Sequence, residues 1–220
     1  NGTRPPHPTG NALLDQLLGA EIRYVRTRED RAIEMERAAA DARQRGARPY
    51  VIPLGASTPL GAAAFVAAIS ELANQIDPPD VIVHASSSGG TQAGLVAGCA
   101  LAGWPTRVVG ISADESAASL ESAGGGPVVG LAKLLDCGAD RFASAPAVVD
   151  DSFVGEGYGI PTMASREAVD LAARTEALFV GHTYTAKALA GLIARVRSGV
   201  FDERSTVLFW HTGGQVGLFA

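Results

Sequence analysis

Short runs rich in β-branched residues alternate with long alanine-rich runs along this chain. Strands are predicted at residues 21–25, 50–53, 81–84, 107–111 and 207–210. Helices are predicted at residues 29–45, 60–75, 91–102, 113–135, 165–178 and 185–198. Strands that are separated by helices form parallel sheets, because each helix carries the chain back along a face of the sheet. The sequence therefore predicts an α/β fold of parallel twisted sheets with helices on both faces.

The composition excludes several classes of function. A net charge of −5 argues against a nucleic-acid-binding surface, which needs a basic stripe. Cys99 and Cys137 are the only cysteines, too few for a disulfide framework or a zinc site, and no metal is predicted. The chain shows no apolar run near the ~20 residues of a membrane span, and its polar start does not resemble a signal peptide. We therefore expect a cytoplasmic protein with no membrane or nucleic-acid partner.

Residues 84–94 (HASSSGGTQAG) are the most informative stretch, because they follow an apolar strand and open a helix. Small residues there let backbone N–H groups approach an anion, and the helix dipole favours negative charge. The stretch lacks the Gly-Lys-Ser/Thr ending of a Walker A loop and the GxGxxG pattern of dinucleotide-binding folds. Two interpretations remain open: a phosphate-binding loop, or a serine-rich tight turn in which Gly94 and Gly98 serve close helix packing.

Three further segments combine small and polar residues. Glycines in residues 155–161 (GEGYGIP) flank Tyr158, which either faces a cleft or packs in an ordinary turn. Tyr184 and Thr185 stand at the start of a predicted helix, where a threonine also serves as a helix cap. Residues 211–214 (HTGG) follow the last predicted strand. Loops at strand and helix ends outline one cleft in parallel sheets.

In this order, these segments resemble the family of D-cysteine desulfhydrase and 1-aminocyclopropane-1-carboxylate deaminase. That family lies within the fold type II, tryptophan-synthase-β-like pyridoxal-phosphate enzymes. Residues 9–20 (TGNALLDQLLGA) and 50–57 (YVIPLGAS) are similar to two more of its motifs, so the resemblance spans essentially all 220 residues. It implies pyridoxal 5'-phosphate as cofactor, a homodimer, and a domain division into residues 1–53, from a smaller mobile domain, and 54–220, which hold the cofactor.

The resemblance also assigns roles to individual residues. The loop that binds the cofactor phosphate corresponds to Ser87, Ser88, Gly89, Gly90 and Thr91. Tyr158 and Tyr184 match the two active-site tyrosines, and Thr185 matches the residue that faces the pyridine nitrogen. That residue is glutamate in the cyclopropane deaminases and threonine in desulfhydrase-like members.

The resemblance implies a lyase or deaminase that removes the α-proton of a small amino acid. A threonine at position 185 leans toward β-elimination, as in D-cysteine desulfhydrase, because a neutral hydroxyl cannot keep the ring nitrogen protonated. The products would be a 2-oxo acid, ammonia and sulfide. The alternative is an activity similar to that of 1-aminocyclopropane-1-carboxylate deaminase.

Departures from the family pattern concern lysine above all. The family's Schiff-base lysine lies upstream of the TGN motif, and neither Lys133 nor Lys187, the only lysines, matches it. We therefore expect the fold to be incomplete, this chain alone to be inactive, and a lysine-bearing upstream segment or chain to complete the site. A non-catalytic binding subunit and a Rossmann-like nucleotide-binding domain are the rival interpretations.

Overall fold

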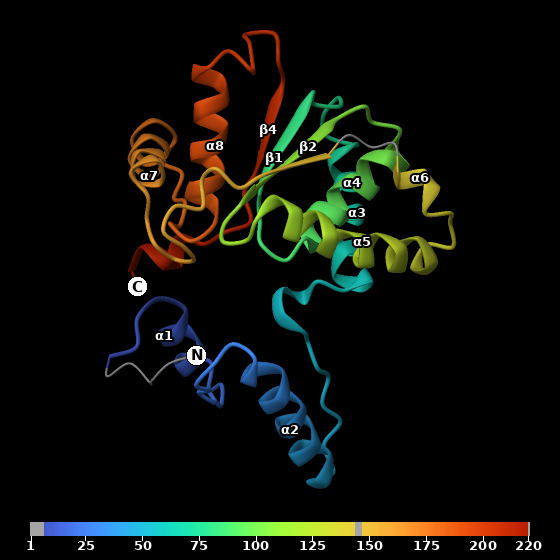
Figure 1. Cartoon of the computed structure of the whole chain (residues 1–220), viewed down its shortest axis with the longest axis vertical. Helices are drawn as coiled ribbons and strands as arrows, with labels where there is room; N and C mark the ends of the chain where they lie inside the picture. Colours follow the sequence, from blue (N-terminus) through green and yellow to red (C-terminus); the bar gives the residue numbers. More distant parts are fainter. Residues whose placement is uncertain (1–6, 144–146, 220) are drawn as a thin grey trace. The chain divides into compact units, whose positions relative to one another are not determined.

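The computed structural model describes residues 7–143 and 147–219 (Figure 1). The chain divides into two compact units, one made of residues 1–54 with 219–220 and the other of residues 55–218. Each unit has its own internal contacts, and each is described separately below. The assignment of the units to a mobile and a cofactor-holding domain stays a prediction.

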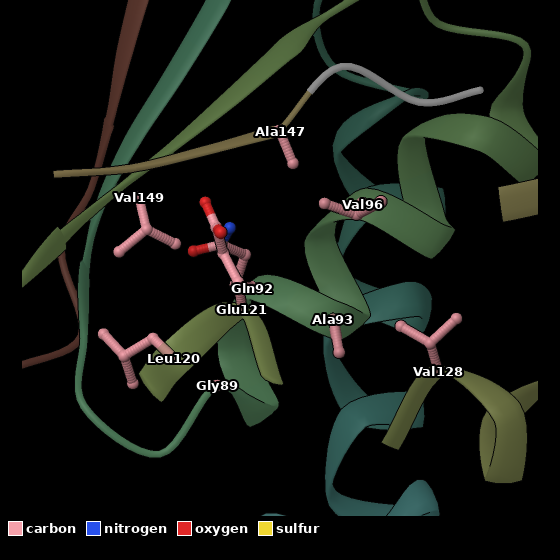
Figure 2. Close-up of a pocket in the computed structure, with 9 residues that line it drawn as sticks. All are labelled: Gly89, Gln92, Ala93, Val96, Leu120, Glu121, Val128, Ala147 and Val149. Carbon is pink, nitrogen blue, oxygen red and sulfur yellow. The ribbon is translucent and has the colours of Figure 1, made fainter. Parts of the chain in front are cut away.

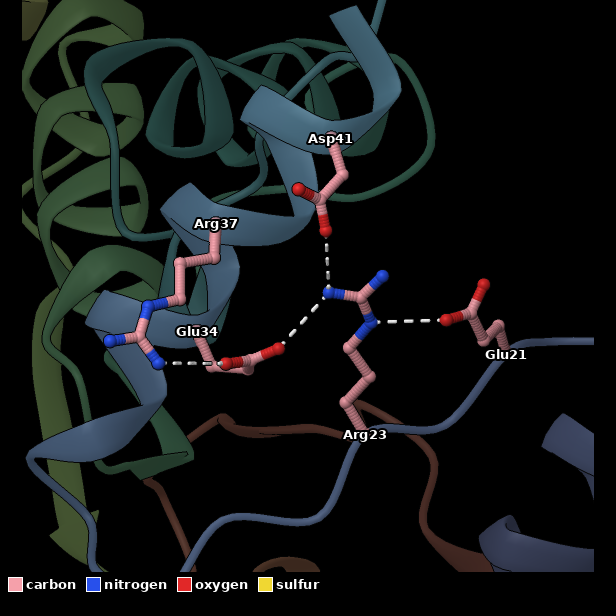
Figure 3. Close-up of polar contacts among 5 residues, drawn as sticks. All are labelled: Glu21, Arg23, Glu34, Arg37 and Asp41. Carbon is pink, nitrogen blue, oxygen red and sulfur yellow. Dashed lines mark hydrogen bonds and ion pairs between the residues drawn. The ribbon is translucent and has the colours of Figure 1, made fainter. Parts of the chain in front are cut away.

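The first unit contains helices α1 (Gly10–Leu17) and α2 (Asp30–Gln44). The segment between them is tied to α2 by ion pairs of a single arginine, as Figure 3 shows. The Arg23 guanidinium lies 3.0 Å from both Glu21 Oε1 and Glu34 Oε1, and 3.4 Å from Asp41 Oδ2. These hydrogen bonds, the one to Glu34 above all, raise the pKa of Arg23.

Two strand predictions in this unit are wrong. Residues 21–25 and 50–53 contain no strand, and no strand occurs elsewhere in residues 7–54. A β-rich run becomes a strand only when a neighbouring chain segment pairs with its backbone, and in this unit neither run has such a partner. Helix α1, by contrast, was not predicted from the sequence.

The second unit is built on a four-stranded sheet, and every strand pair is parallel. The strands are β1 (Val81–Ser86), β2 (Arg107–Ser112), β3 (Ala147–Asp150) and β4 (Val207–Trp210). Their order across the sheet is β3-β2-β1-β4, so β1 pairs on both sides. The sequence predicted β1, β2 and β4 but not the short edge strand β3. The parallel α/β fold class is confirmed.

Helices cover both faces of this sheet (Figure 1). The helices are α3 (Pro59–Leu72), α4 (Gly90–Ala102), α5 (Ala117–Leu134), α6 (Asp140–Ala143), α7 (Met163–Glu176) and α8 (Thr185–Arg197). Two short 3-10 helices are η1 (Leu54–Ala56) and η2 (Gln215–Phe219). Helix α8 lies against β1 and β2 and packs on α7, whereas α3, α4 and α5 pack together on the other face.

Alternation along the strands explains the two cores. Successive strand residues point to opposite faces, so neighbours in β1 enter different clusters. Val83 packs with Ala188 of α8, whereas Ile82 packs with Ile69 of α3 and Leu95 of α4. All six residues of β1 are buried, as expected for a central strand covered on both faces.

Glycines of α4 allow α3 to approach it closely. A Cβ at Gly94 would lie 2.3 Å from the Ala62 carbonyl oxygen and 2.7 Å from Phe65 Cβ. A Cβ at Gly98 would lie 2.8 Å from Ile69 Cβ. The predicted packing role of these two glycines is therefore confirmed, and α3 would have to move to admit a side chain.

We predict that Gly94→Ala destabilises the chain by about 1–3 kcal/mol, the usual cost of overpacking. The matched control is Gly138→Ala, at a position where a Cβ would meet no atom within 4 Å. There alanine is expected to change the free energy of unfolding by less than about 0.5 kcal/mol. Urea unfolding of both variants measures the two changes, and an equal loss in both would contradict the packing role.

His84 is a fully buried histidine in the middle of the sheet. Its Nδ1–H donates to the Ala85 carbonyl oxygen at 2.9 Å, so the neutral ring carries its lone pair on Nε2. Nε2 is buried and has no partner among the described residues. Burial lowers the pKa of His84 to about 4, because the charged ring would lose its hydration.

The stability of the chain should therefore fall in acid. Below pH 6.5 the unfolded chain binds a proton at His84, but the folded chain does so only near pH 4. Between these values acid stabilises the unfolded state by about 3 kcal/mol. The variant His84→Asn, whose amide can still donate to the Ala85 carbonyl, is expected to lose that part of the pH dependence. Urea unfolding between pH 4 and 7 measures it, and equal slopes for both proteins would contradict the assignment.

Candidate functional site

The loop between β1 and α4 has the geometry of an anion site. Ser86 ends β1, Gly89 adopts a positive φ of 77°, and α4 begins at Gly90. The positive φ at Gly89 turns the chain into the helix, a conformation that favours glycine. The loop thus lies at the carboxyl end of a central parallel strand and at the amino end of a helix.

The backbone donors of this loop have no acceptor among the described protein residues. In the described part of the chain, the backbone N–H groups of Ser88, Gly89, Gly90 and Thr91 make no hydrogen bond to protein. The hydroxyl of Ser86 is buried and equally without a protein partner among the described residues. Buried donors without partners are costly, and an anion at this position would satisfy them. The geometry fits a phosphate.

Residues outside the predicted set shape this loop. Ser57 Oγ donates to Ser88 Oγ at 2.6 Å, and Ser87 Oγ donates to Asp114 Oδ1 at 2.8 Å. A Cβ at Gly90 would lie 2.7 Å from Ser57 Oγ and 3.1 Å from Ser57 Cα. Sequence reasoning gave neither Ser57 nor Asp114 a role, although Ser57 ends the YVIPLGAS motif and Asp114 follows β2.

The two predicted site tyrosines lie together. Tyr158 Oη and Tyr184 Oη are 2.5 Å apart, and the rings meet edge to face with centroids separated by 5.6 Å. Tyr158 belongs to the loop after β3, and Tyr184 stands immediately before α8. Tyr158 is 57% exposed, so the pair is open to a ligand. Segments 26 positions apart in sequence thus form one hydroxyl pair.

Thr185, the first residue of α8, uses its buried hydroxyl within the protein. Oγ1 accepts the Gly181 N–H at 2.9 Å and donates to the Gly213 carbonyl oxygen at 3.0 Å. These bonds tie the start of α8 to the loop after β4. To bind a ring nitrogen as predicted, the hydroxyl would have to redirect its hydrogen from Gly213. That role stays a prediction.

The two lysines of the chain lie in opposite environments. Lys133 is exposed on α5. Lys187, in the first turn of α8, is fully buried, and its Nζ donates to the carbonyl oxygens of Ala113, Val154 and Gly157 at 2.8–3.0 Å. An ammonium has three hydrogens, so these three bonds use all of them. Burial lowers the pKa of Lys187, and the charge of Asp114 partly offsets this effect.

These contacts connect the loops at one edge of the sheet. The β1 loop reaches the β2 loop through Ser87 and Asp114, and Lys187 joins the β2 loop to the β3 loop. The tyrosine pair and Thr185 then continue to the loop after β4. The structure thus brings the predicted residues into one connected set of loops, while their individual roles stay predictions.

A separate cavity of about 340 Å³ lies beside the first turns of α4 and α5 (Figure 2). Its walls are mostly aliphatic side chains of α4, α5 and β3, and Gln92 and Glu121 add polar groups to its lining. Of the predicted site residues, Gly89 alone lines it. Across residues 7–143 and 147–219, no three His, Cys, Asp or Glu side chains are grouped to hold a metal ion.

None of the helices in the described ranges combines the length and the apolar character that a membrane span requires.

Comparison with known proteins decides the family. Residues 3–213 match the family described as pyridoxal-phosphate dependent enzyme. The chain belongs to this family. A solved structure described as an ACC deaminase homologue superposes with a TM-score of 0.84 at 30% sequence identity. The match covers 96% of this chain and 64% of that protein.

Threonine deaminase isoform 2 from Solanum lycopersicum shares the fold at lower similarity. It superposes with a TM-score of 0.52 at 16% identity, over 88% of this chain and 53% of that protein. This chain therefore spans about two thirds of the ACC deaminase homologue and about half of the tomato enzyme.

Pyridoxal phosphate is the cofactor of the family, and the loop at residues 86–91 fits its phosphate group. The N–H groups without an acceptor in the described ranges and the buried Ser86 hydroxyl are donors, and the missing side chain at Gly90 lets Ser57 approach the loop closely. The sequence prediction of this cofactor is confirmed at the level of the family.

We predict that Gly90→Val weakens pyridoxal-phosphate binding about tenfold, or ~1.4 kcal/mol. The added side chain would collide with Ser57 and displace the loop. Pyridoxal, which lacks the phosphate, should bind wild type and variant equally in calorimetric titration. The control is Gly138→Val, at a position where a Cβ meets no atom within 4 Å. An equal loss for pyridoxal would argue against a phosphate loop.

Proposed function

We propose that the complete protein is a pyridoxal-phosphate-dependent lyase that acts on a small amino acid by α-proton removal and β-elimination. The observation that carries this proposal is the connected edge of the sheet, where the open phosphate loop and the Tyr158–Tyr184 pair belong to one set of linked loops. The family and the similarity to an ACC deaminase homologue support it.

The residues of this chain would divide the work as follows. Ser87–Thr91 would bind the phosphate through N–H groups and the helix dipole, and Thr185 would face the ring nitrogen. When bound, pyridoxal phosphate supplies the electron sink for negative charge at the substrate α-carbon. The tyrosine pair shares one hydrogen between its two oxygens, and its second hydrogen can be donated to a leaving group.

Thr185 favours elimination of a good leaving group. Its neutral hydroxyl cannot hold a proton on a ring nitrogen as an acid can, so the electron sink is weaker. A thiol at the β-carbon leaves readily and suits a weaker sink. We therefore propose D-cysteine as the substrate, with a 2-oxo acid, ammonia and sulfide as products. The hydrogen bond that this hydroxyl oxygen accepts from the Gly181 N–H holds it in place.

Ring opening of 1-aminocyclopropane-1-carboxylate is the second candidate. The similarity to a protein described as an ACC deaminase homologue favours it. An unactivated ring needs a stronger sink than Thr185 offers, and for this reason elimination is preferred here. A homodimeric, cytoplasmic enzyme completed by a lysine-bearing segment remains part of the proposal.

We predict that these 220 residues alone neither form a covalent adduct with pyridoxal phosphate nor release a 2-oxo acid. The hydrogens of Lys187 are all engaged by carbonyl oxygens, and neither Lys187 nor Lys133 stands at the position of the family's Schiff-base lysine. Noncovalent binding through the phosphate loop is expected to persist. Borohydride trapping with peptide mapping tests the adduct, and assays with D-cysteine and 1-aminocyclopropane-1-carboxylate test turnover.

The results of this experiment distinguish a self-sufficient enzyme, the two candidate activities and a non-catalytic subunit. A stoichiometric adduct at either lysine, with 2-oxo acid release, would make the chain a self-sufficient enzyme and overturn the prediction. The same assays on a longer protein that carries an upstream lysine should give release from D-cysteine. Release from the cyclopropane substrate alone would favour the second candidate. If the longer protein binds pyridoxal phosphate but turns over neither substrate, the result would support a non-catalytic subunit instead.

A further inference from the structure

Lys187 stands out as a buried cation that the chemistry proposed above does not use. Its side chain is 0% exposed, and it is the largest of the fully buried side chains among the described residues. A lone buried ammonium is costly unless its hydrogens find acceptors. Here three backbone carbonyl oxygens satisfy it, at 3.0 Å, 2.8 Å and 2.9 Å.

The three carbonyl groups belong to two different loops. Ala113 follows β2, while Val154 and Gly157 belong to the loop that follows β3. Gly157 directly precedes Tyr158, and Lys187 lies one helical turn after Tyr184. The ammonium therefore joins the segment that carries one tyrosine to the helix that begins beside the other.

We propose that Lys187 is a positioning residue whose ammonium holds the Tyr158 loop against Tyr184 and so maintains their hydroxyl contact. Phe153 packs the start of this loop against the core, while the part around Tyr158 is rich in glycine. Gly155, Gly157 and Gly159 all have positive φ, at 68°, 146° and 75°, and a glycine-rich backbone loses much entropy when it is ordered. Tyr158 itself is more than half exposed, so burial contributes little to its placement.

Neighbouring groups support this role for a cation rather than a neutral donor. Hydrogen bonds from a charged donor are about twice as strong as neutral ones, and each backbone carbonyl offers a lone pair but no charge of its own. Asp114, beside Ala113, provides the negative charge that favours the ammonium form despite burial. The same residue accepts the Ser87 hydroxyl, so the phosphate loop is linked to the tyrosine loop through this region.

The experiment compares Lys187→Met with Lys133→Met, a change at the other lysine of the chain, which is exposed. Tyrosine rings are isotopically labelled, and the Tyr158 and Tyr184 signals are assigned with the Tyr158→Phe and Tyr184→Phe variants. Folded Lys187→Met is expected to lose the ring-to-ring nuclear Overhauser effect of this pair. The amides of Val154 and Ile160, which donate to the Asp151 and Gly157 carbonyl oxygens, should exchange about tenfold faster, while those of the central strands keep their protection. Lys133→Met should match wild type.

A persistent ring contact in folded Lys187→Met would overturn the proposal. If that variant does not fold, the wild-type chain provides a second measurement. Slowly exchanging Nζ protons of Lys187, with couplings across hydrogen bonds to the carbonyl carbons of Val154 and Gly157, are expected. Nζ protons that exchange as fast as those of Lys133 would equally overturn it.

The proposal rests on the proposed function only for the importance of the two tyrosines. In an active protein, Lys187→Met and Tyr158→Phe should lower turnover non-additively, because both disturb the same pair. A lost ring contact with unchanged turnover would contradict the role of the tyrosines in catalysis but leave the positioning role intact. Reduced turnover with the ring contact retained would contradict the positioning role of Lys187 but leave the role of the tyrosines in catalysis intact.

Discussion

Strand β1 is the element on which the rest of the second unit depends. It pairs in parallel with β2 on one side and β4 on the other, and all six of its residues are buried. Parallel pairing places the carboxyl ends of neighbouring strands along one edge, so the loops that follow them become neighbours without any sequence proximity. The serine- and glycine-rich loop at the end of β1 therefore lies centrally among them.

Loops gathered in this way contain many backbone polar groups, and each group needs a partner. In the described structure, side chains from distant elements provide several of them: Lys187 for three carbonyl groups, and Thr185 for Gly181 and Gly213. The N–H groups around Gly89 and Gly90 differ, because no protein acceptor in the described ranges reaches them. The candidate anion site at this edge therefore lies where backbone N–H groups have no acceptor among the described residues.

Helices and strands that follow from a local sequence pattern were predicted. Features that depend on contacts between distant residues were missed. Apolar runs identified β1, β2 and β4, and the helix period identified α2, α3, α4, α7 and α8 to within a few residues. Strand β3 escaped because its sequence AVVD contains only two β-branched residues and ends in an aspartate, whereas the equally short edge strand β4 reads VLFW. Residues 21–25 and 50–53 resemble strands but lack partners. Lys187 could be recognised only as a family lysine, since its acceptors lie 30 to 74 positions away.

Charged residues beside the phosphate loop affect how well it can bind an anion. Residues 85–95 carry no charged side chain, so an anion there would be bound by N–H groups, hydroxyl groups and the helix dipole. Asp114 accepts the Ser87 hydroxyl at 2.8 Å and thereby places a negative charge beside the same loop, which opposes a phosphate. The Lys187 ammonium, bonded to the adjacent Ala113 carbonyl, is attracted to the Asp114 carboxylate and offsets part of its charge. A positive charge at position 187 therefore reduces the repulsion between this acidic neighbour and an anion in the loop, which a neutral side chain of the same length could not do.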